Sequence, residues 1–68
     1  MKVKYFKDTD TALLEFSDAI VEETREISEN VNVDLDASGN LVSMTIEHAA
    51  TVAKLPQVSL EEIGASAA

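Results

Sequence analysis

The amino-acid sequence predicts an α+β, mainly β fold, in which an antiparallel β-meander sheet of about five strands is followed by one short C-terminal helix. Two pairs of segments with alternating polar and apolar residues predict strands, and a polar turn separates the members of each pair. After Glu47 the alternation gives way to a stretch rich in alanine and valine, which favours a helix.

The first pair of predicted strands forms a hairpin near the N-terminus. Residues 2–6 alternate with Val3 and Tyr5 on one face, and residues 12–16 alternate with alanine, leucine and phenylalanine on one face. The Lys-Asp-Thr-Asp segment of residues 7–10 lies between them and consists mostly of residue types that favour turns. We therefore expect these two strands to pair with each other.

The clearest alternation lies in the second pair of strands. Residues 31–35 and 42–46 each place three large apolar side chains on one face and polar side chains on the other. The Ala-Ser-Gly-Asn segment of residues 37–40 predicts the turn between them. Residues 20–27 contain four charged residues and predict a weaker strand at an edge of the sheet, where charge prevents unwanted pairing.

The C-terminal part of the chain predicts helix rather than strand. Residues 48–55 favour a short helix that packs on the sheet and ends before Pro56. Ser59 and Glu62 have the spacing of a capping box, which predicts a one-turn helix within residues 58–63. We expect a single small β-rich domain over residues 1–55 and a tail over residues 56–68, with residues 65–68 disordered.

The amino-acid composition limits the kinds of cross-link or metal site that could stabilise such a small domain. The chain has 68 residues, no cysteine and one histidine, which excludes disulfides, thiolate zinc sites and sites built from several histidines of one chain. A chain of this size buries only about 60% of its unfolded surface on folding. Self-association into a homo-oligomer is therefore a hypothesis for how more apolar surface is buried.

The charge of the chain indicates which partners it favours. The formal net charge is −8, and between Asp8 and Ala53 there are 11 acidic residues against the single Arg25. Such a field repels phosphate backbones and disfavours nucleic acid, whereas it attracts a basic protein. The alternative is that acidity only keeps the domain in solution. No apolar run reaches the ~18 residues of a membrane span and no signal-peptide pattern is present, so we expect a cytoplasmic protein and no membrane partner.

Six short segments form an ordered series along the chain. They are MKVKY at residues 1–5, ALLEFS at 12–17 after a turn ending in Asp10, ETREI at 23–27, NVNVDLD at 30–36, GNLV at 39–42, and a last strand with Met44 and Ile46. This series resembles the YuzE-like family of small proteins, also called domain of unknown function 2283, from Met1 to about Ala50. The resemblance implies a compact β-meander with a C-terminal helix, in free-standing bacterial proteins without an assigned activity. It implies no catalytic residues, and for some members it implies a small partner in a toxin–antitoxin-like arrangement.

One group of residues has the spacing of a cation-binding loop. Oxygen-bearing side chains stand at alternate positions around Gly39, as in the first half of a calcium loop: Asp34, Asp36, Ser38 and Asn40. The twelfth position, counted from Asp34, is Thr45 rather than glutamate, and the flanking segments are strands. The same residue types are explained if Asp34 and Asp36 are solvent-facing strand residues and Ser38, Gly39 and Asn40 form a turn, so we predict no metal and no cofactor. A divalent-cation-binding domain is the first alternative, with Asp34 and Asp36 as its candidate ligands.

The turn between the first two predicted strands offers further carboxylates. Asp8 and Asp10 flank Thr9, and we interpret them as an Asx-turn in which a carboxylate bonds its own backbone. In the cation-binding alternative they would join Asp34 or Asp36 in space.

No residue pattern predicts an enzyme. His48 is the only histidine, and the sequence gives no reason for a nucleophile and an orienting group to converge on it. The second alternative is a small enzyme whose carboxylates converge at a dimer interface, although nothing supplies a cofactor motif or an oxyanion hole.

The leading prediction is a non-enzymatic protein-interaction module, antitoxin-like or an accessory partner, that binds a basic protein. The candidate partner-binding residues are an acidic strip and the apolar residues of the tail, namely Glu22, Glu23, Glu26, Glu29, Val58, Leu60 and Ile63. The alternative for the strip is a solvated sheet edge. Four further side chains, Tyr5, Phe6, Leu13 and Leu41, are expected to form an exposed apolar patch unless the C-terminal segment covers them.

Overall fold

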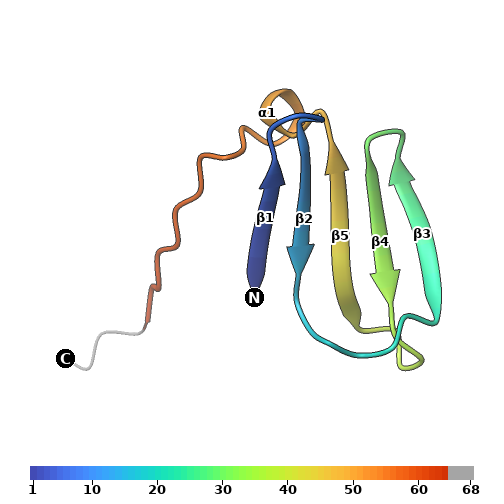
Figure 1. The fold of residues 1–68 in the computed structure, drawn as a ribbon. Coiled ribbons are helices and arrows are strands. Elements are labelled where there is room, and N and C mark those ends of the chain that lie inside the picture. Colours follow the sequence, from blue (N-terminus) through green and yellow to red (C-terminus); the bar gives the residue numbers. More distant parts are fainter. Residues whose placement is uncertain (65–68) are drawn as a thin grey trace.

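The computed structural model describes residues 1–64 and shows one open β-sheet with a short helix at one end (Figure 1). The elements are β1 (Lys2–Phe6), β2 (Thr11–Glu15), β3 (Glu23–Ser28), β4 (Val31–Leu35), β5 (Leu41–Glu47) and α1 (Ala49–Val52). The predicted mainly β, antiparallel fold class is confirmed. The disorder predicted for residues 65–68 concerns positions outside the described residues.

The order of the strands in the sheet is β1-β2-β5-β4-β3, which differs from the simple meander that we expected. Strands β3, β4 and β5 do form a meander, but β2 pairs with β5, and residues 16–22 connect β2 to β3 past the ends of β5 and β4 (Figure 1). A simple meander would put the charged β3 at the centre. Instead the centre is β5, which buries Val42, Ser43 and Ile46, and β3 takes an edge.

The two hairpin turns form where the sequence predicted them. Residues 7–10 make the turn between β1 and β2. In the turn between β4 and β5, Asp36 accepts hydrogen bonds on Oδ1 from the backbone N–H groups of Ser38 and Asn40, both at 2.9 Å. Gly39 has φ +83°, a left-handed conformation that favours glycine. The turn expected over residues 37–40 is therefore present, whereas Asp36, which was expected to belong to the strand, lies beyond the end of β4 and caps the turn.

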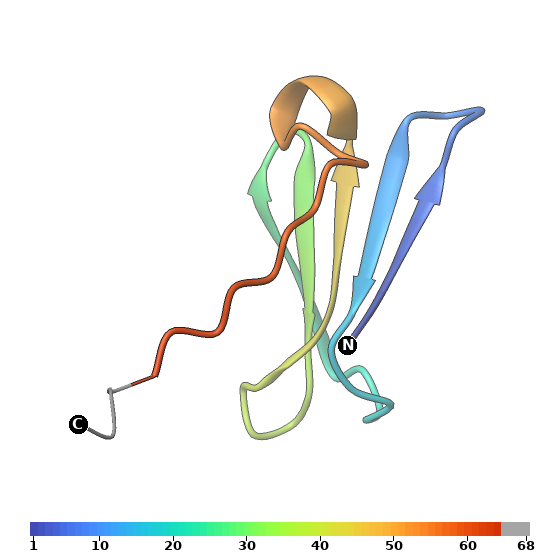
Figure 2. The ribbon, with the colours of Figure 1, turned by 90° about the vertical axis from the view of Figure 1, so that its left-hand side faces the viewer.

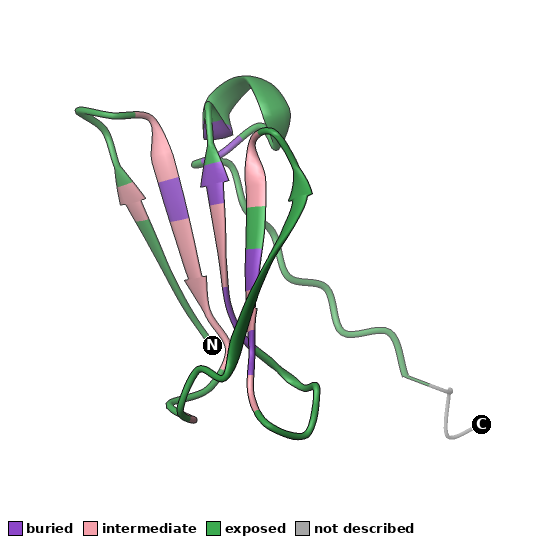
Figure 3. Ribbon diagram, turned by 90° about the vertical axis from the view of Figure 1, so that its right-hand side faces the viewer, coloured by how far each residue is buried: buried purple, intermediate pink, exposed green. Residues whose placement is uncertain are grey.

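The core is small and lies at the α1 end of one sheet face. Ala12 of β2, Ile46 of β5, Ala49 of α1 and Leu55 form one buried cluster. Tyr5, Leu14, Val31 and Met44 are half-buried and pack against that cluster. Figure 3 shows buried residues on the three inner strands and none along β3. Burial therefore comes from the sheet centre and from the residues that α1 brings over it.

Helix α1 is shorter than the helix predicted over residues 48–55. His48 at its N-cap has φ 56° and Lys54 has φ 60°, both left-handed, so only Ala49–Val52 is helical. The chain then turns back, and the N–H of Leu55 donates to the carbonyl oxygen of Ala49 at 3.1 Å. We expected the helix to cover the apolar face of the sheet. It covers only one end of that face, because it is a single turn (Figure 2).

Beyond Pro56 the chain leaves the sheet. Residues 57–64, called the tail segment here, form neither helix nor strand, so the one-turn helix predicted within residues 58–63 is not formed in the structure. Every residue of this segment is exposed, whereas Leu55 just before it is buried. Among the described residues, no helix has the length and apolar character that a membrane span requires.

The core cluster generates a first prediction. Ile46→Ala lowers the free energy of unfolding by about 2–3 kcal/mol, because it opens a cavity in a cluster with little surrounding structure to close it. Urea unfolding followed by circular dichroism measures the change. The control is Ile20→Ala, at a side chain that is 85% exposed, which changes stability by less than about 0.5 kcal/mol. Equal effects of both substitutions would contradict the assignment of the core.

Candidate functional site

The sheet has one apolar and one polar face, and strand register decides which side chains share each. Ala12 lies opposite Ile46, and Leu14 and Val33 lie on either side of Met44, so these residues share the face on which α1 packs. We call this the apolar face. The neighbouring positions of each strand point to the opposite face, called the polar face here.

A row of polar residues crosses the polar face from one sheet edge to the other. Successive strands place these residues directly opposite one another: Lys2 in β1, Glu15 in β2, Ser43 in β5, Asp34 in β4 and Thr24 in β3. Asp34 accepts hydrogen bonds from the Thr24 hydroxyl at 2.6 Å and from the Ser43 hydroxyl at 2.5 Å. One carboxylate thereby links the three strands β3, β4 and β5.

The charges in this row are stabilised by their neighbours. The hydroxyl of Ser43 first, and that of Thr24 second, lower the pKa of Asp34. Glu15 forms an ion pair with Lys4, with 2.9 Å between Oε1 and Nζ, and this lysine lowers the pKa of Glu15. That Oε1 atom is shielded from solvent and accepts no hydrogen bond of good geometry within residues 1–64, so Lys4 is its main electrostatic partner.

A second polar cluster joins the β1–β2 turn to α1. Asp10 Oδ1 accepts a hydrogen bond from the Tyr5 hydroxyl at 2.6 Å and another from the N–H of Ala50 at 3.0 Å. The carbonyl oxygen of Asp10 accepts the N–H of Ala49 at 2.9 Å. The Tyr5 hydroxyl lowers the pKa of Asp10, and the same hydrogen bond raises the pKa of Tyr5. Asp10 therefore satisfies backbone donors at the start of α1.

The candidate cation ligands do not converge. Asp34 is engaged by two hydroxyl groups on the polar face, and Asp36 caps the β4–β5 turn. Asp10 lies in the cluster with Tyr5 at the α1 end, and Asp8 is exposed. Within residues 1–64 the structure brings no three histidine or acidic side chains together as a metal site would require.

His48 is exposed and precedes α1. Its Nδ1 lies 3.0 Å from Oδ1 of Asn30, and neither Ser43 nor Glu47 forms a hydrogen bond with its ring among the described residues. The part of the chain that the structure describes encloses no pocket. This arrangement positions His48 between the β3–β4 turn and α1.

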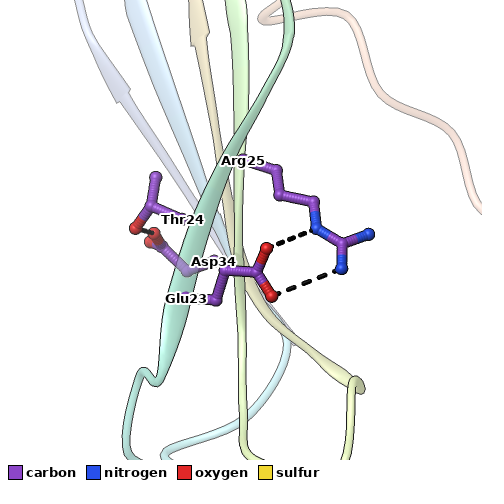
Figure 4. Close-up of polar contacts among 4 residues, drawn as sticks. All are labelled: Glu23, Thr24, Arg25 and Asp34. Atoms are coloured by element: carbon purple, nitrogen blue, oxygen red, sulfur yellow. Dashed lines mark hydrogen bonds and ion pairs between the residues drawn. The ribbon is translucent and has the colours of Figure 1, made fainter.

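The four glutamates of the acidic strip lie along the β3 edge but not on one face. Glu23 and Glu26 point to opposite faces of β3, Glu22 precedes the strand, and Glu29 lies in the turn that follows it. Figure 4 shows Glu23 and Arg25 on one side of β3 and Thr24 with Asp34 on the other. Arg25 Nε lies 2.7 Å from Glu23 Oε2, an ion pair that lowers the pKa of Glu23. The other three glutamates form no ion pair within residues 1–64.

The four side chains expected to form one apolar patch are separated. Tyr5 lies on the apolar face and is half-buried, whereas Phe6 lies on the polar face and is exposed. Phe6 and Leu13 are close neighbours on that face, but Leu41 lies at the far end of β5. The apolar residues of the tail, Val58, Leu60 and Ile63, are all exposed and lie apart from the acidic strip.

Comparison with family profiles gives one match, over residues 2–49, to the family described as Protein of unknown function (DUF2283). The chain belongs to this family. Comparison with curated proteins and with solved structures gives no match. The DUF2283 match spans all five strands and ends at Ala49, the residue whose N–H donates to Asp10. Leu55 and the tail segment lie outside it.

Sequence reasoning missed two features of this DUF2283 domain. Asp8 and Asp10 were interpreted as an Asx-turn, but among the described residues neither carboxylate accepts a hydrogen bond from the backbone of its own turn; that of Asp10 instead accepts the Tyr5 hydroxyl and the N–H of Ala50, 40 positions further along the chain. The polar row across the sheet was missed because it requires the β2–β5 pairing. Alternation within each strand already separates the polar-face residues from the apolar-face residues. Only the order of the strands in the sheet was missing for a prediction of the polar row.

A second prediction concerns the attachment of α1. Asp10→Gly removes both side-chain hydrogen bonds but tolerates the φ of 54° at this position. We expect amide hydrogen exchange at Ala50 to accelerate by about tenfold or more, because its N–H loses the carboxylate that accepts it. The control is Asp8→Gly, which removes an exposed carboxylate from the same turn. Unchanged exchange in Asp10→Gly would refute the role of Asp10.

A third prediction concerns pH. The folded pKa of Asp34 is below its unfolded value, so its contribution to stability is present above the unfolded pKa of about 3.9 and is lost as pH falls through the folded pKa. Thermal unfolding between neutral and acidic pH therefore shows a loss of Tm below about pH 4. Asp34→Asn has a lower Tm at neutral pH and a smaller further loss in acid. A parallel pH dependence in both proteins would contradict the role of Asp34.

Proposed function

We propose that this protein is a non-enzymatic protein-interaction module that binds an extended, basic segment of a partner protein at the outer edge of β3. In this proposal it acts in the cytoplasm as an antitoxin-like or accessory partner. The observation that carries the proposal is the exposure of β3 and its free outer edge. All six of its residues are exposed, and only its inner edge is paired.

A free sheet edge offers a row of backbone donors and acceptors to an incoming strand. Most edge strands are protected by charge, and β3 is protected against most partners in this way. Glu22, Glu26 and Glu29 flank the free edge and none of them forms an ion pair within residues 1–64. Charge that repels an ordinary strand attracts a basic one, so the same glutamates support selectivity for lysine and arginine.

Apolar side chains beside this edge can make hydrophobic contacts with a partner in addition to the attraction between charges. Ile27 is exposed at the β-bulge of β3, and Val21 is exposed just before the strand. An interface with a small apolar centre and a charged rim is typical of protein recognition. The alternatives have less support, because Asp34 and Asp36 are engaged in hydrogen bonds and the described residues enclose no pocket.

Binding to a defined probe tests this proposal. The probe is a short synthetic peptide that alternates lysine with valine, and fluorescence anisotropy at low and high salt measures its affinity. We expect binding that weakens as salt rises and that protects β3 amides from hydrogen exchange. A matched peptide with glutamate in place of lysine does not bind.

Charge reversal on the protein is the accompanying prediction. Glu26→Lys with Glu29→Lys weakens peptide binding by about tenfold, which corresponds to about 1.4 kcal/mol. The matched control, Asp8→Lys with Asp18→Lys, changes the net charge equally at exposed positions away from β3. Equal weakening by both double variants would mean that only net charge attracts the peptide. No binding by the unaltered protein would remove the proposed site.

A further inference from the structure

The tail segment exposes large apolar side chains that nothing within residues 1–64 covers. Val58 is 62% exposed, Leu60 95% and Ile63 83%. The segment runs outward past the β1 edge in Figure 1, and Figure 2 shows that it also runs away from the plane of the sheet. An extended segment with such residues gains stability when a surface covers them.

The exit of the tail segment from the core is fixed. Leu55 is buried against Ala12, Ile46 and Ala49, and its N–H donates to the carbonyl oxygen of Ala49. Just beyond, the N–H of Gln57 donates to the carbonyl oxygen of Lys54 at 3.1 Å. With this turn in place, the segment leaves the core in a direction away from its own sheet (Figure 2). Contact with a second copy leaves the turn intact.

The outer edge of β1 has the chemistry to receive this segment. Within residues 1–64 no strand pairs with it, so its backbone groups are free to pair. Three of the five basic residues of the chain lie in or beside β1, namely Lys2, Lys4 and Lys7. The tail segment carries Glu61 and Glu62 and no basic residue. This is the one edge of the acidic sheet that attracts an acidic strand.

We propose that the tail segment of a second copy adds to the outer edge of β1 as an antiparallel strand, and that two copies exchange these segments reciprocally. The proposal is independent of the function proposed above, because β1 and β3 are opposite edges of the sheet. Reciprocal exchange gives a two-fold dimer, a closed assembly in which each edge–tail contact occurs twice.

Side-chain alternation selects one register for this pairing. With Leu60 opposite Val3, Val58 lies opposite Tyr5 and extends the apolar face, since Val3 and Tyr5 both lie on that face. The same register places Glu61 opposite Lys2 on the polar face. Lys2 lies opposite Glu15 of β2 but forms no ion pair within residues 1–64, so Glu61 would approach it from the outer side of β1.

The surface area of the chain is consistent with a missing partner. The accessible area is 5371 Å², whereas a compact chain of 7.3 kDa has about 4,200 Å². The excess of about 1,200 Å² exceeds the ~800 Å² that each partner buries in an interface of standard size. A reciprocal exchange would remove much of this excess, because the extended tail contributes to it.

The first test uses the full chain and two matched variants. Sedimentation equilibrium over a range of concentrations measures the dimer dissociation constant. We expect a dimer for the unaltered protein and a dissociation constant raised by about tenfold or more in Leu60→Ser. The control Ile20→Ser removes a similarly exposed apolar side chain from the β2–β3 connection and leaves the dimer unchanged. Circular dichroism confirms that both variants fold.

The second test addresses the register by charge exchange. Glu61→Lys and Lys2→Glu each raise the dissociation constant by about tenfold, because the repulsive pair occurs twice in the dimer. The double variant Lys2→Glu with Glu61→Lys restores most of the affinity. Glu29→Lys, at the far edge of the sheet, has the same charge change as Glu61→Lys and serves as its control.

Four outcomes would overturn the proposal. A monomer at all concentrations would do so, as would a dimer that Leu60→Ser leaves unchanged. Species larger than a dimer would indicate open-ended pairing between β1 and β3 instead. Failure of the charge exchange to restore affinity would exclude this register. Open-ended pairing would also occupy the β3 edge, whereas the other three outcomes do not bear on peptide binding at β3, so in those cases the two proposals fail separately.

Discussion

The carboxylate of Asp10 connects parts of the chain that are far apart in sequence, and the small core depends on this connection. It accepts the hydroxyl of Tyr5 and the N–H of Ala50, while the backbone carbonyl of the same residue accepts the N–H of Ala49. A helix of one turn cannot form alone in water. Asp10 supplies acceptors for its first amides and thereby holds Ala49 over the sheet, where Leu55 completes the cluster.

A sheet covered at only one end needs another source of cohesion, and the polar face provides it. Asp34 joins β3, β4 and β5 through the hydroxyls of Thr24 and Ser43, and the Lys4–Glu15 ion pair joins β1 and β2. Hydrogen bonds to an ionised group are stronger than neutral ones, and short hydroxyl side chains lose little entropy when they form them. The polar row thus fixes strand register on the face that carries no apolar core.

Local pattern predicted the local structure well, and non-local pairing explains what it missed. Alternation located β1, β4 and the two hairpin turns, and the charge of residues 20–27 correctly indicated an edge strand. The β2–β5 pairing was not predicted, because no turn links those strands and the match of Ala12 to Ile46 is visible only in three dimensions. The helix was predicted too long, since the left-handed φ of Lys54 depends on how Leu55 enters the core. Among the candidate site residues, Asp34 lies on the polar face of β4 as expected, while Asp36 lies past the strand and caps the turn, and the role of Asp10 required knowledge of where α1 packs.

The two edges of the sheet carry opposite charge, and this asymmetry explains why the basic edge needs a cover. If the glutamate-lined edge of β3 met the lysine-lined edge of β1 in another copy, the contact would be heterologous, and repeated contacts of that kind grow into open chains. The β-bulge at Ile27 lies in the pairing of β3 with β4, next to one of these edges. A tail segment seated on β1 would occupy the other and would limit assembly to two copies. The acidic edge would then remain the only free one, which is the arrangement that a selective binder of basic segments requires.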